Sequence, residues 1–216
     1  RDVERSRGLG DVYKRQEMIH TRKIIFVTSN QGKVESANKY FGGKVVFDTY
    51  DYEIPEIRGS LNEIAVAKVK AAYEKTSAPT IAMDAGFVIN ELNGFPGNYV
   101  NFALGTIGIK GILKLMEDKE KRECSFVQCL AYYDGEDEPR IFYGKHQGHI
   151  TYEERGVISK DDWSELSLIF IPEGEWNTTG RTLAELTHEE RVRITRDNDN
   201  SAFAKFRDWY LNTMKK

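Results

Sequence analysis

A polar loop brings a lysine to the start of a predicted helix. Its sequence is Thr28-Ser29-Asn30-Gln31-Gly32-Lys33, between a strand predicted over residues 23–28 and a helix whose apolar residues recur from Val34. The free N–H groups and the dipole of a helix N-terminus favour an anion such as phosphate, and Lys33 adds a positive charge. A capped turn that happens to end in lysine explains the same residues equally well. The loop is not a Walker A loop, because Val34 takes the place of the required Ser or Thr.

A second lysine, Lys68, lies on the apolar face of the next predicted helix. Residues 60–63 read Ser-Leu-Asn-Glu, which is a capping box and predicts a helix that runs to about residue 76. Lys68 shares its stripe with Leu61, Ile64, Ala65 and Ala72. A lysine on an inward face needs a partner, and a carboxylate or a phosphate would serve. The alternative is a stem that snorkels past the edge of the stripe.

Two acidic residues are candidates for metal binding. Asp84 follows the apolar residues 80–83, which predict a buried strand that ends at Asp84-Ala85-Gly86, and ligands of α/β sheets bind beyond the carboxyl ends of strands. Glu56 follows Pro55 in an acidic stretch. Carboxylates near a phosphate-binding loop suit Mg²⁺, which takes hard oxygen ligands and is usually shared with substrate phosphates. Taken alone, Glu56 is equally well explained by a solvated acidic loop.

The elements around these residues predict an α/β fold. Strands over residues 23–28, 45–50 and 80–83 alternate with helices, which implies parallel pairs. Residues 123–133 and 140–150 flank a turn-rich segment and predict an antiparallel hairpin. We also expect a strand over residues 166–171, a short helix from Thr187, and a last helix with the apolar stripe Ala202, Phe203, Phe206 and Tyr210. The prediction is one α/β unit of two lobes with a cleft between them.

Composition and charge exclude several classes of protein. The 216 residues are 40% hydrophobic and carry 31 Lys and Arg against 34 Asp and Glu, a formal charge of -3. This is enough apolar material for a sizeable core. No apolar run approaches the ~20 residues needed to cross a bilayer, so we expect no membrane partner. Dense basic clustering is absent, which argues against a nucleic-acid partner.

Compartment and chain organisation follow from two further features. Cys124 and Cys129 have an odd separation that points them to opposite faces of a strand, so we expect no disulfide framework and a reducing, cytoplasmic location. Residues 1–17 lack an amphipathic period and precede Met18. We interpret them as a non-native or disordered extension, with a native flexible arm as the alternative, and residues 18–216 as a single domain.

Taken in order, these segments resemble the inosine triphosphate pyrophosphatase family, which clears deaminated purine nucleotides such as ITP, dITP and XTP. The most specific piece is Asp84-Ala85-Gly86-Phe87 followed by Leu-Asn-Gly-Phe-Pro-Gly-Asn-Tyr at residues 92–99, which is similar to the family's D-S-G…L-x-G-x-P-G-x-Y block. The following segments also match in order: residues 28–33, 54–56, Lys68, 148–150, 155–156, 170–172 and 182–185.

The resemblance implies a fold, a reaction and a set of site residues. The fold is an elongated, two-lobed α/β protein around a central mixed sheet, usually a homodimer, with the nucleotide in the cleft between lobes. Water attacks the α-phosphorus of a nucleoside triphosphate and releases nucleoside monophosphate and pyrophosphate. The implied roles are triphosphate binding by Thr28, Asn30, Lys33 and Lys68, binding of Mg²⁺ or Mn²⁺ by Glu56 and Asp84, and catalysis by Asp84, Lys33 and Lys68.

The chain departs from the family pattern at four places. Met83 stands where the family has an acid, and Ala85 replaces a hydroxyl residue. Residues 164–168 occupy the place of the family's F-G-[YW]-D-P segment. Thr195-Arg196-Asp197 occupies the place of its S-H-R signature. These losses fall mainly on the side that recognises the base, while the phosphate side is largely kept. Because a hydrogen-bonding pocket discriminates strongly, we expect an altered base preference.

Four residues are candidates to rebuild the base pocket: Arg191, Arg196, Trp163 and Trp176. The departures also leave two other functions open. The first is a nucleotide-binding or interaction protein that kept the fold but lost turnover. The second is hydrolysis of another phosphorylated compound in the same cleft.

Overall fold

The central element is a long mixed sheet. The structure is a computed structural model that describes residues 23–50, 59–159, 162–174, 176–197 and 200–213, with the backbone alone for 195–197. Seven strands of this part of the chain form one sheet in the order β2-β1-β3-β5-β6-β7, and β4 pairs with β3. The strands are β1 (Lys23–Val27), β2 (Val46–Tyr50), β3 (Thr80–Ile89), β4 (Pro96–Gly97), β5 (Glu123–Tyr133), β6 (Arg140–Ile150) and β7 (Phe170–Pro172).

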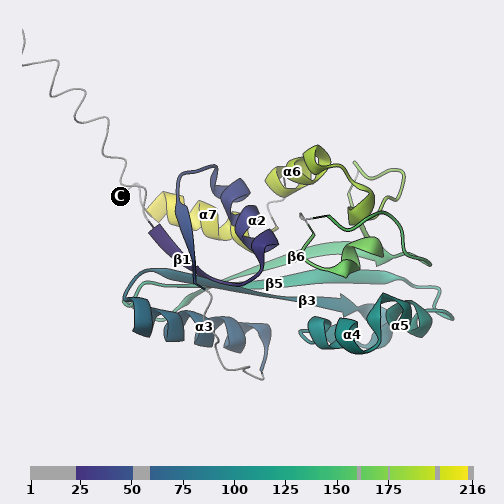
Figure 1. Ribbon diagram of the computed structural model, residues 1–216, viewed down its shortest axis with the longest axis horizontal. Coiled ribbons are helices and arrows are strands. Elements are labelled where there is room, and N and C mark those ends of the chain that lie inside the picture. Colours follow the sequence, from purple (N-terminus) through teal and green to yellow (C-terminus); the bar gives the residue numbers. More distant parts are fainter. Residues whose placement is uncertain (1–22, 51–58, 160–161, 175, 198–199, 214–216) are drawn as a thin grey trace, which may run out of the picture.

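Helices cover both faces of the sheet. The α-helices are α2 (Gln31–Phe41), α3 (Leu61–Thr76), α4 (Val100–Thr106), α5 (Gly108–Leu115), α6 (His188–Asp197) and α7 (Ala202–Thr213), and the 3₁₀ helices are η1 (Asn90–Leu92), η2 (Glu165–Leu168) and η3 (Leu183–Glu185). Figure 1 shows α2, α6 and α7 on one face and α3, α4 and α5 on the other, with β3, β5 and β6 running along the length of an elongated molecule. Within the described residues, no helix is long and apolar enough to cross a membrane.

The strand directions agree with the predicted arrangement. β1 pairs in parallel with both β2 and β3, because each connection between these strands contains a helix. β5 and β6 form the expected antiparallel hairpin, and β7 extends it at the edge. Cys124 and Cys129 lie on β5 as free, buried cysteines in two different apolar clusters, as their odd separation predicted.

The prediction that the third strand ends at Asp84 is wrong. β3 continues to Ile89, because β5 pairs with it along its whole length, with Asp84 opposite Cys129. Gly86 is required within the strand: a Cβ there would lie 2.6 Å from the carbonyl oxygen of Gly97 on β4. β1, by contrast, ends at Val27, opposite Ala82. Asp84 therefore still lies just beyond the carboxyl end of a parallel strand, the end of β1.

The strand predicted over residues 166–171 is only partly right. The chain first forms η2, since the hydroxyl of Ser164 accepts a hydrogen bond from the backbone N–H of Leu166 at 3.0 Å and turns the segment. Only β7 reaches the edge of β6, where Phe170 lies opposite Ile150. Leu166 and Ile169 are fully buried, so their apolar character reflects packing in the core rather than membership of the sheet.

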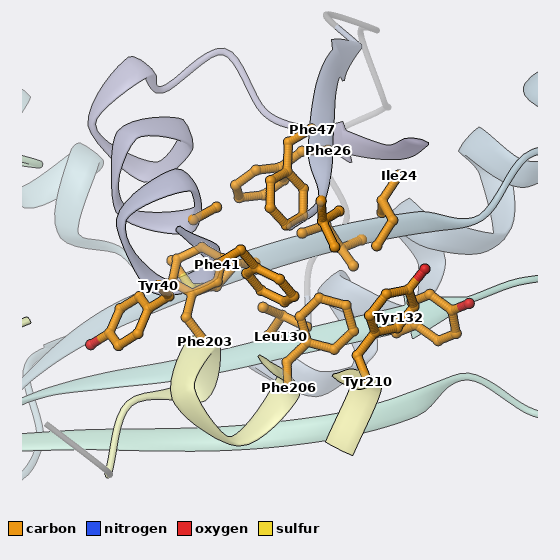
Figure 2. Close-up of a cluster of buried hydrophobic side chains, with 14 of the residues drawn as sticks. Ile24, Phe26, Tyr40, Phe41, Phe47, Leu130, Tyr132, Phe203, Phe206 and Tyr210 are labelled. Carbon is orange, nitrogen blue, oxygen red and sulfur yellow. The ribbon is translucent and has the colours of Figure 1, made fainter. Parts of the chain in front are cut away.

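The molecule has a core at each end of β3. The aromatic core packs Phe26 of β1 and Phe41 of α2 against Phe203 and Phe206 of α7 (Figure 2). The α5 core gathers side chains from β3, α5, β5, η2 and β7, among them Phe87, Ile89, Ile112, Leu166 and Phe170. β3 gives Met83 to the aromatic core and Phe87 to the α5 core. Asp84 lies on the stretch of β3 between these two residues.

Candidate active site

Asp84 and Lys68 form an ion pair between the sheet and α3. The Nζ atom of Lys68 lies 2.8 Å from each carboxylate oxygen of Asp84, and the two side chains are 29% and 19% exposed. Ser60 and Glu63 form the predicted capping box that starts α3, which sets the register that turns Lys68 toward the sheet. The prediction that this inward lysine has a partner is confirmed, and the partner is a carboxylate.

Lys33 reaches the same point from the opposite face of the sheet. Asn30 caps α2, and its side-chain oxygen accepts the backbone N–H of Lys33 at 3.1 Å. The Nζ atom of Lys33 donates to the carbonyl oxygen of Met83 at 2.8 Å. Burial lowers the pKa of Lys33 to about 8, while nearby Asp84 raises it and Lys68 lowers it further. Two lysines from two helices therefore converge on residues 83 and 84 of β3.

Met83, which replaces an acid of the family pattern, faces away from this pair. Its side chain is 2% exposed and packs in the aromatic core. Asp84 points to the opposite face, because neighbouring side chains alternate along a strand. The backbone carbonyl of Met83, rather than its side chain, is what contacts Lys33. The substitution leaves Asp84 as the carboxylate at this point of the strand.

These residues line a first cavity of about 500 Å³. The residues that the sequence predicted there are Thr28, Asn30, Lys33, Lys68 and Asp84, and all of them line it. Four residues that were not predicted as site residues also line it: Tyr50, Asn98, Asn101 and Ser164. Asn98 lies in the block at residues 92–99 that matches the family, which was a usable signal. Its amide donates to the carbonyl oxygen of Gly59 at 2.7 Å and so ties the block to the start of α3.

A second cavity adjoins the first one. Its lining includes Ser36, Gln128, His146, Asp162 and Arg191, and it shares Ala85, Phe126, Trp163 and Ser164 with the first cavity. Arg191, a predicted substrate-binding residue, therefore lies in a cavity continuous with the one that holds both lysines. Trp163 stands at the junction.

Arg191 is held by a buried carboxylate. Its Nη1 atom lies 2.6 Å from Oδ1 of Asp162, whose side chain is 1% exposed, and its Nε donates to the carbonyl oxygen of Leu186 at 3.2 Å. Burial raises the pKa of Asp162, but hydrogen bonds from Arg191, Ser167 and Ser159 outweigh this and leave its pKa below the usual value. Asp162 therefore carries its charge. Asp162 was not predicted as a site residue, because the capping spacing of Ser159 and Asp162 precedes no periodic apolar run.

Trp163 joins the wall of the second cavity to α2. Its indole N–H donates to the hydroxyl of Ser36 at 3.1 Å, and its backbone oxygen accepts the side-chain amide of Asn30 at 3.4 Å. Gly32 makes room for the ring, since a Cβ there would lie 2.9 Å from Cδ1 of Trp163. The loop that bears Lys33 thus also positions this tryptophan.

Three candidates remain to be placed: Glu56, Arg196 and Trp176. Glu56 lies outside the described residues, as does the side chain of Arg196. Trp176 lines a third cavity with Lys145, Glu190 and Arg193. This cavity shares His146, Pro172 and Ile194 with the second one, so a place for Trp176 in the base pocket stays a prediction. Among the described residues, no three His, Cys, Asp or Glu side chains cluster as a metal site. Asp84 is the one carboxylate of the described chain that lines the first cavity.

The fold and the site define an α/β protein with a lysine-lined cavity beyond the carboxyl end of a parallel strand, a place suited to a phosphorylated ligand. Residues 24–209 match the model of the Ham1 family, and the chain belongs to this family. It is 37% identical over 196 residues to the dITP/XTP pyrophosphatase of Thermococcus kodakarensis, covering 89% of this chain and 100% of that protein.

Two further relatives support the same assignment. The dITP/XTP pyrophosphatase of Methanopyrus kandleri is 35% identical, covering 89% of this chain and 98% of that protein. The inosine triphosphate pyrophosphatase of Aspergillus fumigatus is 33% identical, with coverages of 89% and 96%. The predicted resemblance to the inosine triphosphate pyrophosphatase family is therefore confirmed.

Solved structures confirm the fold. A HAM1 protein from Coxiella burnetii is similar with a TM-score of 0.73 and 23% identity, covering 88% of this chain and 99% of that one. The Ham1 protein of Staphylococcus aureus is similar with a TM-score of 0.70 and 22% identity, covering 89% of this chain and 100% of that one. The predicted α/β fold around a central mixed sheet is thus correct.

Proposed function

We propose that the chain is a nucleoside triphosphate pyrophosphohydrolase, which converts a nucleoside triphosphate and water to the monophosphate and pyrophosphate. The substrates are nucleotides of the ITP, dITP and XTP type, as the names of the relatives indicate. The observation that carries the proposal is the convergence of Lys33, Lys68 and Asp84 in one cavity. Two cations and one carboxylate are what a triphosphate and an attacking water require.

In this mechanism the two lysines bind the triphosphate. Water attacks the α-phosphorus, the bond from that phosphorus to the bridging oxygen breaks, and negative charge moves onto the departing pyrophosphate. Ammonium groups already fixed at that position stabilise the charge as it develops. Asp84 orients the water and accepts its proton. Lys68 then keeps the carboxylate directed at the nucleophile through its two contacts of 2.8 Å.

The donor set of the first cavity fits a Mg²⁺ ion shared with the substrate, and Mn²⁺ is the alternative. Mg²⁺ is usually held by one or two carboxylates together with substrate phosphates. Asp84 offers hard oxygen ligands beside the two phosphate-binding lysines, and we expect Glu56 to be the second carboxylate. When bound, the ion supplies additional positive charge to the phosphoryl oxygens.

We place the base in the second cavity. The two cavities share Trp163 and Ser164, so a nucleotide whose phosphates meet the lysines extends past this tryptophan. The chain lacks the F-G-[YW]-D-P and S-H-R segments with which the family recognises the base, and Arg191 is the residue that we expect to replace them in the second cavity. Arg196 remains a second candidate for this role. The base pocket is therefore altered relative to the family pattern.

We propose that the protein is a homodimer, as the family resemblance implies, and that it lies in the cytoplasm, as the spacing of its two cysteines indicates. Light scattering of the purified chain tests the homodimer, and a monomer mass would contradict it. Fractionation of cells that express the full chain tests the location.

Pyrophosphate release tests the function. The full chain with Mg²⁺ is given ITP, dITP, XTP and the common nucleoside triphosphates, beside Asp84→Ala. We expect release from the deaminated purine nucleotides that falls to background in the variant. Equal release by Asp84→Ala would contradict the role of this residue. Nucleotide binding without release under Mg²⁺ or Mn²⁺ would instead identify a binding protein that kept the fold.

A further inference from the structure

We infer that Asp162 is a positioning residue for base selection, which holds Arg191 so that its guanidinium presents hydrogen-bond donors to a carbonyl edge of the base. The inference rests on the proposed function and adds to it a residue outside the family's motifs. It would make the choice of base depend on a buried ion pair rather than on Arg191 alone.

The contacts of Arg191 fix the plane of its guanidinium. Nη1 is held by Asp162 at 2.6 Å and Nε by the carbonyl oxygen of Leu186 at 3.2 Å. Within the part of the chain that the structure describes, no hydrogen bond occupies Nη2. A guanidinium carries donors only, in a rigid fork. With two of its nitrogens held, the third offers N–H groups of fixed direction on the wall of the second cavity.

Asp162 does not compete for the base, because its oxygens are already taken. Oδ2 accepts the backbone N–H of Ser159 at 2.8 Å and its hydroxyl at 3.0 Å, while Oδ1 accepts Arg191. Asp162 is the one carboxylate of the described chain that lines the second cavity. The charged group presented to a ligand near this pair is therefore a donor, whereas the acceptor is sequestered.

His146, which also lines the second cavity, is electrically neutral. Oε1 of Gln128 accepts the backbone N–H of Ala202 at 3.1 Å, so its amide nitrogen faces Nε2 of His146 at 3.2 Å. An amide nitrogen only donates, which makes this histidine nitrogen an acceptor. His146 therefore adds no charge that would override the preference set by Arg191.

A base with a carbonyl oxygen at the edge that faces Arg191 accepts a hydrogen bond from Nη2. A base with an exocyclic amino group at that position places one donor against another and forms no hydrogen bond. A site built around a hydrogen bond rejects an analogue that lacks it far more strongly than an apolar site rejects a change of size. ITP and ATP differ in this group and are the matched pair of probes.

The test compares kcat/KM for ITP and ATP in Asp162→Asn, which keeps the shape and removes the charge. We expect the preference for ITP to fall about tenfold, through a higher KM for ITP, with ATP changed less than about threefold. In an Arg191→Met background, Asp162→Asn should change the preference no further, because it acts through that arginine. If Asp162→Asn does not fold, Arg191→Met alone should show the same loss of preference.

Glu190→Gln is the matched control. Glu190 pairs with Arg181 in another Arg–carboxylate contact, but neither residue lines the second cavity, so the preference should stay unchanged. The inference is overturned if Asp162→Asn lowers kcat/KM for ITP and for ATP by the same factor. It is also overturned if Glu190→Gln shifts the preference for ITP as much as Asp162→Asn does. If the wild-type chain releases pyrophosphate from no nucleotide, the proposed function fails, and quenching of tryptophan fluorescence by ITP and ATP then gives the same comparison as a binding ratio.

Discussion

The two adjoining cavities differ in how their walls are built. The first cavity takes its charged groups from regular elements, Lys33 from α2, Lys68 from α3 and Asp84 from β3. The second takes Asp162 and Trp163 from an irregular segment that precedes η2, and Arg191 from α6. Its ion pair is buried, with exposed fractions of 11% and 1%, against 29% and 19% for Lys68 and Asp84. The first cavity thus presents cations and a carboxylate to a ligand, whereas the second presents the cations Lys39 and Arg191 and buries its carboxylate.

Removal of Lys68 should give the largest effect if the first cavity carries the chemistry. Lys68→Met takes away the partner of Asp84 and one positive charge from the cavity. We expect kcat/KM for the preferred nucleotide to fall at least about 100-fold, the size seen when one charge-stabilising donor is removed from an active site. Steady-state pyrophosphate release measures the loss.

Lys70→Met is the control for this variant. Lys70 lies on the same helix and pairs with Glu138 at the same 2.8 Å, but outside both cavities. Exposed ion pairs of this kind contribute little, so turnover should change less than about twofold. Comparable losses in both variants would mean that Lys68 acts through helix stability and not through the site.

The contrast between the cavities also explains how far the sequence could be interpreted. Lys68 was predictable because a capping box and an apolar stripe fix the register of α3, and Asn30 because a polar residue before a periodic run predicts an N-cap. The extent of β3 was not, since Asp84-Ala85-Gly86 has the composition of a break. Its continuation depends on pairing with β5, more than forty residues later in the chain.

The walls of the second cavity were the hardest to predict. Asp162 and Trp163 belong to no repeat, and their positions depend on contacts with Arg191, Asn30 and Ser36 from distant segments. No local pattern of residues records such contacts. Arg191, Trp163 and Trp176 entered as candidates only because the family segments were missing, and Trp176 lines a cavity next to the one that the other two residues share.

A titration of stability sharpens the comparison, because it tests whether the second cavity excludes added charge. Burial lowers the pKa of His146 to about 4 from a usual 6.5. The folded state therefore resists protonation that the unfolded chain accepts, so stability is unaffected above pH 6.5 and falls as the pH drops from 6.5 toward 4. We expect a loss of about 2 kcal/mol by pH 4.5 from this residue.

Urea unfolding at pH 7.0, 5.5 and 4.5 measures this loss. His146→Gln has no charge to gain, so its free energy of unfolding should fall about 2 kcal/mol less than that of the wild type over this range. His149→Gln is the control, because His149 is exposed on the same strand. An identical pH dependence for His146→Gln and the wild type would show that the second cavity tolerates the charge.

The smallest effect is expected at Gly32, whose backbone lies against Trp163 at the junction of the two cavities. Gly32→Ala places a methyl group 2.9 Å from Cδ1 of Trp163 and must displace that ring, although alanine favours the helix by about 1 kcal/mol. We therefore expect an almost unchanged melting temperature, a KM for the preferred nucleotide raised about threefold to fivefold, and a shifted tryptophan emission. In Gly105→Ala, on α4, the added Cβ meets no atom within 4 Å, so the KM and the tryptophan emission should stay as in the wild type and the melting temperature should not fall. A normal KM together with a shifted emission would mean that the position of Trp163 does not matter to the nucleotide, and that the phosphate-binding loop and the second cavity act independently.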